Sequence, residues 1–150
     1  MSAIINQSTD NTYIGNLKST VPTANGVFVT PNYTTQSATP VVDATAGDKA
    51  GLLMTYNQNT HIDQELVADA DFVVPTEKYL RLKSFLPGNA FTTDKFTGDI
   101  STFNVGDTVA VGAGGILEAI GSRNPAMTFS VKEKTTLYGK PALKVQVVTI

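Results

Sequence analysis

The sequence contains no cysteine and no tryptophan, and its only histidine is His61. Without cysteine the chain can form no disulfide, no thiolate nucleophile and no cysteine-ligated zinc site. His61 is the only side chain whose unperturbed pKa lies close to neutral pH. Enzyme chemistries that depend on a thiol or on several imidazoles are therefore excluded.

An excess of charge and long apolar runs are also missing. The chain has 11 basic and 13 acidic residues, a net charge of −2 and no long block of either sign, whereas nucleic-acid-binding domains carry a basic patch. No run of about 18 apolar residues occurs, and the first residues lack the basic start and apolar run of a secretory signal. We therefore expect no direct nucleic-acid partner, no membrane partner and no signal-directed export.

What is abundant is threonine. The 150 residues, enough for about one domain, include 21 Thr, 10 Asn and 12 Gly but only 16% charged residues. Threonine favours strands, and Asn and Gly favour turns. Short apolar runs bounded by turn residues predict strands at 52–56, 66–74, 79–85, 108–111, 116–120, 126–133 and 142–150. The predicted fold is mainly β, with a small β-barrel or sandwich body over residues 48–150.

Residues 1–47 differ from the rest because Thr, Asn, Ser and Pro dominate and charges are few. The Asn-Gly and Thr-Pro steps interrupt any helix, and the apolar area is too small to offset the backbone entropy of ordering. We therefore predict an extended N-terminal arm that is held either by the body of its own chain or by a partner. The candidate partner-binding residues are the apolar run Val27, Phe28 and Val29, together with Tyr33.

The glycine-rich stretch 109–115 looks at first like a dinucleotide-binding loop. That fingerprint requires a third small residue where Leu117 stands, followed by a long helix, and here Gly121 ends the segment. Glycine adopts positive φ without steric cost. The sequence therefore predicts a glycine turn between two antiparallel strands.

His61, Asp63 and Glu65 would share one face of an extended segment. No second histidine and no cysteine can complete a zinc site, and the spacing differs from that of a helix-loop-helix calcium loop. A solvated acidic loop is the favoured interpretation, and a strand or one to two helical turns would both fit residues 61–68. No Gly-x-Ser-x-Gly elbow occurs that could work with the histidine. We therefore expect no metal, no cofactor and no enzyme activity.

Four phenylalanines share the stretch 85–103, namely Phe85, Phe91, Phe96 and Phe103. With Lys83 and Lys95 interleaved, they could stack on nucleobases or sugars. A β domain without tryptophan also needs phenylalanine to fill its core, and the core-filling interpretation is favoured.

Three stretches together carry a resemblance to a known family. They are Phe-Val-Val-Pro at 72–75, Tyr-Leu-Arg-Leu at 79–82, and the run 103–120, which contains F-N-V-G-D-T-V-A-V-G and ends in I-L-E-A-I. Over residues 49–150 the sequence resembles the head decoration (cement) proteins of tailed bacteriophages. The resemblance implies a small β-rich body with an extended arm, binding to the outside of an expanded capsid without catalysis. No individual contact residue carries over.

The resemblance also implies the partners and the location. The partner would be the major capsid protein, with arm and body bridging neighbouring capsomers, and the protein could associate with itself as a homotrimer. The protein would be made in the host cytoplasm and lie on the capsid exterior of the virion. The alternative is a glycan- or receptor-binding β module of a phage fibre or tail that displays the stretch 85–103.

Overall fold

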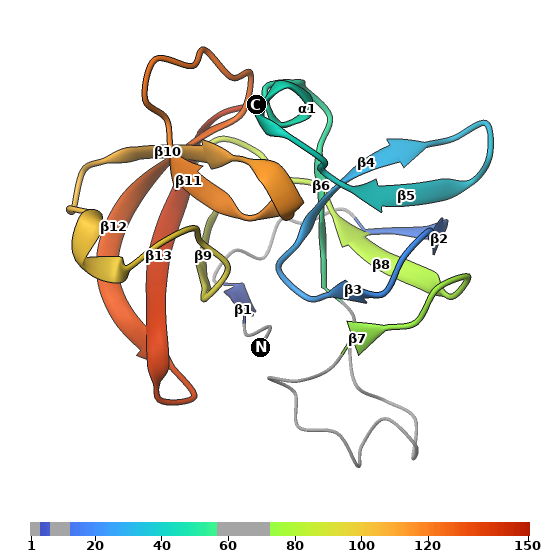
Figure 1. Cartoon of the computed structure of the whole chain (residues 1–150), viewed down its shortest axis with the longest axis horizontal. Coiled ribbons are helices and arrows are strands. Elements are labelled where there is room, and N and C mark those ends of the chain that lie inside the picture. The colour runs from blue at the N-terminus through green and yellow to red at the C-terminus, as the bar shows by residue number, and fades with distance from the viewer. Residues whose placement is uncertain (1–3, 7–12, 57–72) are drawn as a thin grey trace.

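The computed structural model describes residues 4–6, 13–56 and 73–150, and over these residues the fold is mainly β. Figure 1 shows two β units side by side, a barrel formed by strands between residues 13 and 83, and a six-stranded sheet formed by residues 4–6 together with strands between residues 90 and 149. The prediction of a mainly β fold built on a small barrel is confirmed.

The first unit is a closed five-stranded barrel with the order β2-β5-β4-β6-β8. Its strands are β2 (Tyr13–Ser19), β4 (Phe28–Asn32), β5 (Ser37–Pro40), β6 (Leu53–Thr55) and β8 (Tyr79–Lys83). β2 pairs in parallel with β5 and antiparallel with β8, which closes the ring. The barrel interior is filled by Leu17, Val29, Ala38, Leu53, Val74, Leu80 and Leu82. A short pair, β3 (Thr23–Ala24) with β7 (Val73–Val74), lies beside it.

The predicted extended arm over residues 1–47 is wrong for residues 13–47. Three of the five barrel strands, β2, β4 and β5, come from this segment. The threonine-rich sequence supplies their pleated backbone, and β6 and β8, which lie beyond residue 47, supply two of their hydrogen-bonding neighbours. Burial of a few side chains such as Leu17 and Phe28 then offsets the ordering entropy that the segment alone could not offset. The barrel therefore straddles the predicted boundary at residue 48.

The second unit is a six-stranded sheet with the order β1-β9-β13-β12-β10-β11. Its strands are β1 (Ile4–Asn6), β9 (Ala90–Thr93), β10 (Thr108–Val111), β11 (Leu117–Ala119), β12 (Thr128–Leu137) and β13 (Lys140–Thr149). The sheet curls, because Thr97 N–H donates to Leu117 O at 2.8 Å and Leu117 N–H donates to Lys95 O at 3.0 Å. The outer edge of β11 is thereby bonded to the segment that follows β9.

Within the described residues, three short helices connect these strands. α1 (Ala44–Gly47) begins at Asp43, whose carboxylate accepts from Ala46 N–H at 2.8 Å. η2 (Ile100–Thr102) follows β9, and η3 (Ala113–Gly115) joins β10 to β11.

One aromatic cluster holds the two units together. Side chains alternate across a strand, so in β4 Val29 faces the barrel interior while Phe28 faces the second sheet. The ring of Phe28 lies 5.5 Å from that of Phe129 and 6.3 Å from those of Phe85 and Phe91, measured between centroids. The barrel and the sheet therefore share a core and form one body.

Candidate functional site

The glycine-rich stretch is a structural joint between the two units, which we call the glycine joint (residues 112–115). β10 and β11 pair antiparallel on either side of it, so the predicted turn is confirmed. Gly114 N–H donates to Val41 O at 2.8 Å. At Gly115, where φ is +75°, a Cβ would collide with the carbonyl oxygen of Phe28. This backbone is packed against the first unit, which leaves no room for the phosphates of a dinucleotide.

The side chain of Arg123 binds the segments next to the glycine joint by hydrogen bonds. Its Nε donates to Asp48 Oδ1 at 2.9 Å, and its Nη1 donates to Glu118 Oε1. Its Nη2 donates to the carbonyl oxygens of Val111 at 2.7 Å and Ala44 at 3.1 Å. With one fork of donors on four acceptors, the guanidinium links α1 to the β10–β11 hairpin and serves the fold.

The phenylalanines of the stretch 85–103 lie mainly in the core. Phe85, Phe91 and Phe103 are at most 4% exposed, so the core-filling interpretation is confirmed for them. Phe96 is only partly buried and packs edge-on against Phe103 with a centroid distance of 5.5 Å. Three of the four rings are therefore out of reach of a nucleobase or sugar in solution.

Lys83 and Lys95, which could have flanked exposed rings, do not form part of a stacking surface either. Lys83 is buried, and its Nζ lies 4.0 Å from the centroid of the Tyr56 ring. Lys95 is partly buried, and its backbone carbonyl accepts from Leu117 N–H. Both lysines are therefore packed into the fold instead of flanking exposed rings.

The structure separates the four predicted partner-binding residues. Val27, Phe28 and Val29 are at most 8% exposed and belong to the interior, so the prediction that these side chains contact a partner is wrong for the folded chain. Tyr33 is 60% exposed at the turn between β4 and β5. The sequence predicted the β-like run correctly but placed it on a surface, because its burial depends on Phe129 and other residues far along the chain.

The predicted acidic group His61, Asp63 and Glu65 lies outside the described residues. Within 4–6, 13–56 and 73–150, no group of three His, Asp or Glu side chains is placed to hold a metal ion. Over the same ranges, no helix has the length and apolar character to cross a membrane.

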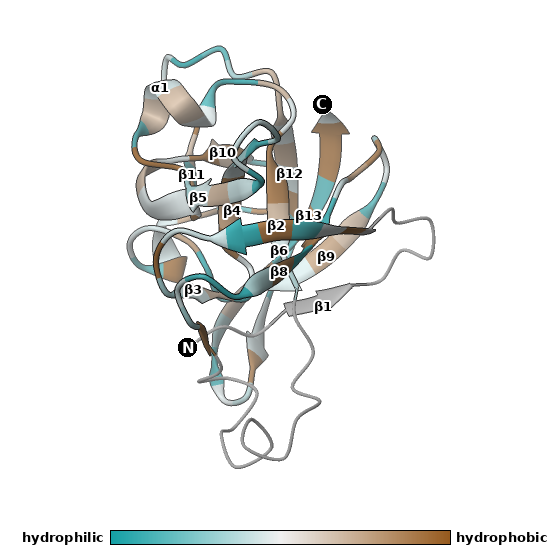
Figure 2. Ribbon diagram, turned by 90° about the vertical axis from the view of Figure 1, so that its right-hand side faces the viewer, coloured by the Kyte–Doolittle hydropathy of each residue, from teal (hydrophilic) through white to brown (hydrophobic). Residues whose placement is uncertain are grey.

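A surface that the sequence analysis did not single out lies where β13 ends. Leu86, Val148 and Ile150 are 56%, 51% and 52% exposed, and we call them the apolar contact surface. The turn carrying Leu86 is bonded to β13, because Gly88 N–H donates to Val147 O at 2.8 Å and Val147 N–H donates to Asn89 O at 2.8 Å. Figure 2 shows the end of β13 in the brown of hydrophobic residues.

The sequence holds a signal for this surface. In β13 the inward positions are apolar, and the outward positions are polar at Lys144 and Gln146 but apolar at Val148, with exposed Ile150 directly after the strand. A strand whose outward side changes from polar to apolar presents apolar area to a partner or to solvent. The alternation of polar and apolar residues in β13 did not show whether the rest of the chain would cover Val148.

Comparison with known proteins adds no family. No protein-family model matches the sequence, and no curated protein matches it. The geometry and the motifs above therefore carry the functional argument.

Proposed function

We propose that this protein is a virion structural protein that binds the outer surface of a phage capsid and stabilises it by bridging capsomers. Its partner is the major capsid protein, and its place is the capsid exterior. The proposal starts from the resemblance to head decoration proteins over residues 49–150. With residues 13–47 folded into the barrel, a long arm no longer serves as the contact, and the body itself must bind.

The observation that carries the proposal is the apolar contact surface. Its three side chains lie on bonded, adjoining segments and keep about half of their area in solvent. Burying the exposed half of one such side chain contributes about 1 kcal/mol. Three of them support a modest contact, and association of the protein as a homotrimer would multiply it by engaging several capsomers at once.

The construction of the body suits a role under mechanical load. The glycine joint and the hydrogen bonds of Arg123 connect the first part of the chain to the second sheet at two places, and Phe28 connects them through the core. A protein that bridges capsomers transmits force through itself, and densely packed interiors transmit strain with little compression. This arrangement supports the proposed stabilising role.

The test measures binding of labelled protein to expanded heads of the parent phage assembled without it. Co-sedimentation gives the occupancy of the wild-type protein and of a Val148→Asp variant. We expect Val148→Asp to lose at least tenfold in affinity, because a carboxylate would have to be desolvated at the contact.

The matched control is Tyr138→Asp. Tyr138 is 66% exposed at the opposite end of the β12–β13 hairpin, about 30 Å away along the strand. We expect this variant to bind heads like the wild type, with circular dichroism confirming that both variants fold. Equal binding by folded Val148→Asp would overturn the assignment of this surface, and no binding of the wild type to heads would overturn the function.

A further inference from the structure

A second surface feature combines apolar and charged side chains. It is an open pocket of about 380 Å³ between the segment that follows β9 and the start of β13, at the lower end of the usual size of ligand sites. Its lining includes Asp94, Phe96, Asp99, Ile100, Lys140 and Pro141. We call it the aspartate–lysine pocket.

The walls of this pocket are fixed before any ligand arrives. Thr97 N–H donates to Leu117 O, which ties the segment to β11. Asp99 begins η2 by accepting from Ser101 N–H at 2.8 Å. The Phe96 ring is held edge-on against buried Phe103. Preorganised walls reduce the ordering cost of binding.

The pocket offers three kinds of contact. Phe96, Ile100 and Pro141 supply apolar area. The backbone N–H of Ser101, followed by its hydroxyl, holds the pKa of the Asp99 carboxyl below its usual 3.8, so this carboxylate is ionised and accepts hydrogen bonds at neutral pH. Asp94 lines the same pocket.

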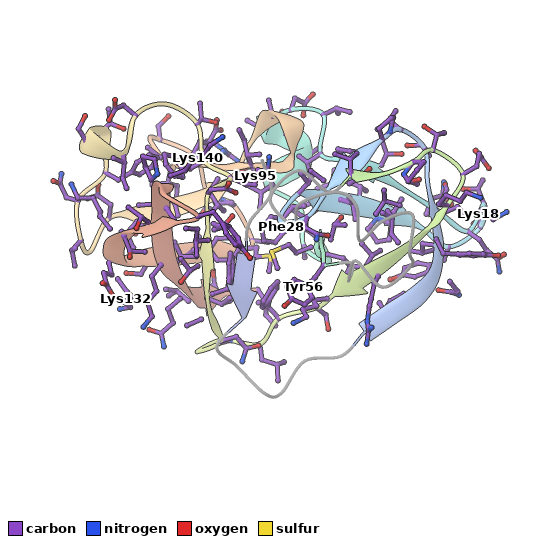
Figure 3. The ribbon with its side chains drawn as sticks, turned by 90° about the horizontal axis from the view of Figure 1, so that it is seen from below. Lys18, Phe28, Tyr56, Lys95, Lys132 and Lys140 are labelled. Carbon is purple, nitrogen blue, oxygen red and sulfur yellow. The ribbon has the colours of Figure 1, made fainter. Side chains whose placement is uncertain are left out.

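Lys140 contributes the donor. Its ammonium group forms no ion pair with any residue in the described part of the chain, and Figure 3 shows it on the side of the sheet covered by the pale yellow segment that contains η2. An ammonium group carries three donors and no acceptor. It therefore adds a positively charged donor to a pocket that Asp94 and Asp99 also line.

We propose that the aspartate–lysine pocket binds a saccharide, with one neutral pyranose ring seated in it. The C–H face of a pyranose packs on apolar and aromatic side chains, while its hydroxyls donate to the carboxylates and accept from the ammonium. Two carboxylates repel a phosphate group. Among the described residues, no third acidic or histidine side chain lies close enough to Asp94 and Asp99 to complete a cation site. The open shape admits the terminal residue of a longer glycan.

The experiment uses the full chain and defined probes. Saturation-transfer NMR is recorded with the methyl glycosides of glucose, galactose, mannose and rhamnose and with N-acetylglucosamine, each at about 10 mM, so that binding with a Kd of about 1 mM is detected. We expect transfer to at least one of them, with amide shifts of residues 94–100 and Lys140 in the labelled protein. No transfer to any probe, or shifts confined to other residues, overturns the proposal.

Two variants test the named contacts. Lys140→Ala should weaken binding of the sugar at least tenfold, because the variant loses a charged hydrogen-bond donor. Lys132→Ala, an exposed lysine on β12, is the matched control and should change the Kd less than twofold. Equal affinity of Lys140→Ala and wild type overturns the site.

Two further arms separate other ligands from sugars and this proposal from the capsid function. Calcium chloride and inorganic phosphate are titrated in the same way, and a response of the pocket amides to either one without a response to sugars overturns the saccharide assignment. Lys140→Ala should still bind phage heads at wild-type occupancy. Loss of head binding in this variant would place the capsid contact at the pocket and overturn its role as a separate glycan site.

Discussion

Arg123 Nη2 lies 2.7 Å from Asp48 Oδ1, and this ion pair joins the turn after β11 to the end of α1. The two residues are 75 positions apart in the sequence. The Arg123 side chain is 16% exposed, so its charge is largely withdrawn from solvent and depends on protein acceptors. The pair is thus a link between the first and second halves of the chain.

Replacing Arg123 should weaken the whole fold. Arg123→Ala leaves two carboxylates and two carbonyl oxygens without their donor, and we expect a loss of about 2 kcal/mol in the free energy of unfolding. Arg123→Lys should recover only part of this, because an ammonium cannot reproduce the planar fork. Urea denaturation followed by circular dichroism measures both variants. An unchanged midpoint for Arg123→Ala would contradict the linking role.

The glycine joint allows a comparison between adjacent residues. Gly114 and Gly115 both have positive φ, +79° and +75°, so alanine is strained at either position. A Cβ at Gly114 meets nothing within 4 Å, whereas one at Gly115 collides with Phe28 O. We expect Gly114→Ala to cost about 1 kcal/mol and Gly115→Ala clearly more. Equal urea midpoints for the two variants would show that the glycine joint does not pack tightly against Phe28 of β4.

Phe28 should be among the most sensitive core positions. Phe28→Ala removes the ring that touches Phe85, Phe91 and Phe129, and we expect a loss of about 3–5 kcal/mol. Val42→Ala, at a side chain that is 69% exposed, is the control and should stay within about 0.5 kcal/mol of wild type. Thermal unfolding measures both. Similar melting temperatures would mean that the aromatic cluster does not hold the units together.

The start of η2 should respond to acid. The pKa of Asp99 is lowered in the folded chain, so its contribution to stability is present above the usual value of 3.8 and is lost as the pH falls through the lowered pKa. The amide proton of Ser101 should titrate with a midpoint below 3.8 in an NMR series. Asp99→Asn should abolish that titration. A midpoint at or above 3.8 would indicate that the hydrogen bond is absent.

The β10–β11 and β12–β13 hairpins of the second unit could be predicted because their contacts are local, whereas β1 and β9 pair with residues far away in the sequence. The strand at 108–111 matches β10, the turn at 112–115 is present, and the last two predicted strands form the β12–β13 hairpin around Gly139. Each of these pairs is joined by a short turn whose glycines leave a mark in the sequence. Pattern and structure therefore agree where the partner strand comes next.

The first unit could not be predicted in the same way. β2, β4 and β5 are short and rich in threonine, and β2 closes the barrel through β8, with Tyr13 opposite Lys83. Nothing near residue 13 in the sequence indicates that partner. For the same reason the burial of Phe28 was missed, since Phe129 lies about one hundred residues later. The surface at Val148 was missed because a break in polar alternation does not say whether a partner covers it.

Closure of the barrel by β8 also affects how the chain folds during its synthesis. While the chain leaves the ribosome, β2, β4 and β5 emerge before the strand that completes their ring, and the ring of Phe28 emerges well before Phe129. Pairing over such sequence distances is slow because the loop entropy is lost before the contacts form. A nascent or truncated chain ending near residue 110 therefore exposes strand edges and an aromatic face, which favour chaperone binding or aggregation until β12 and β13 are synthesised.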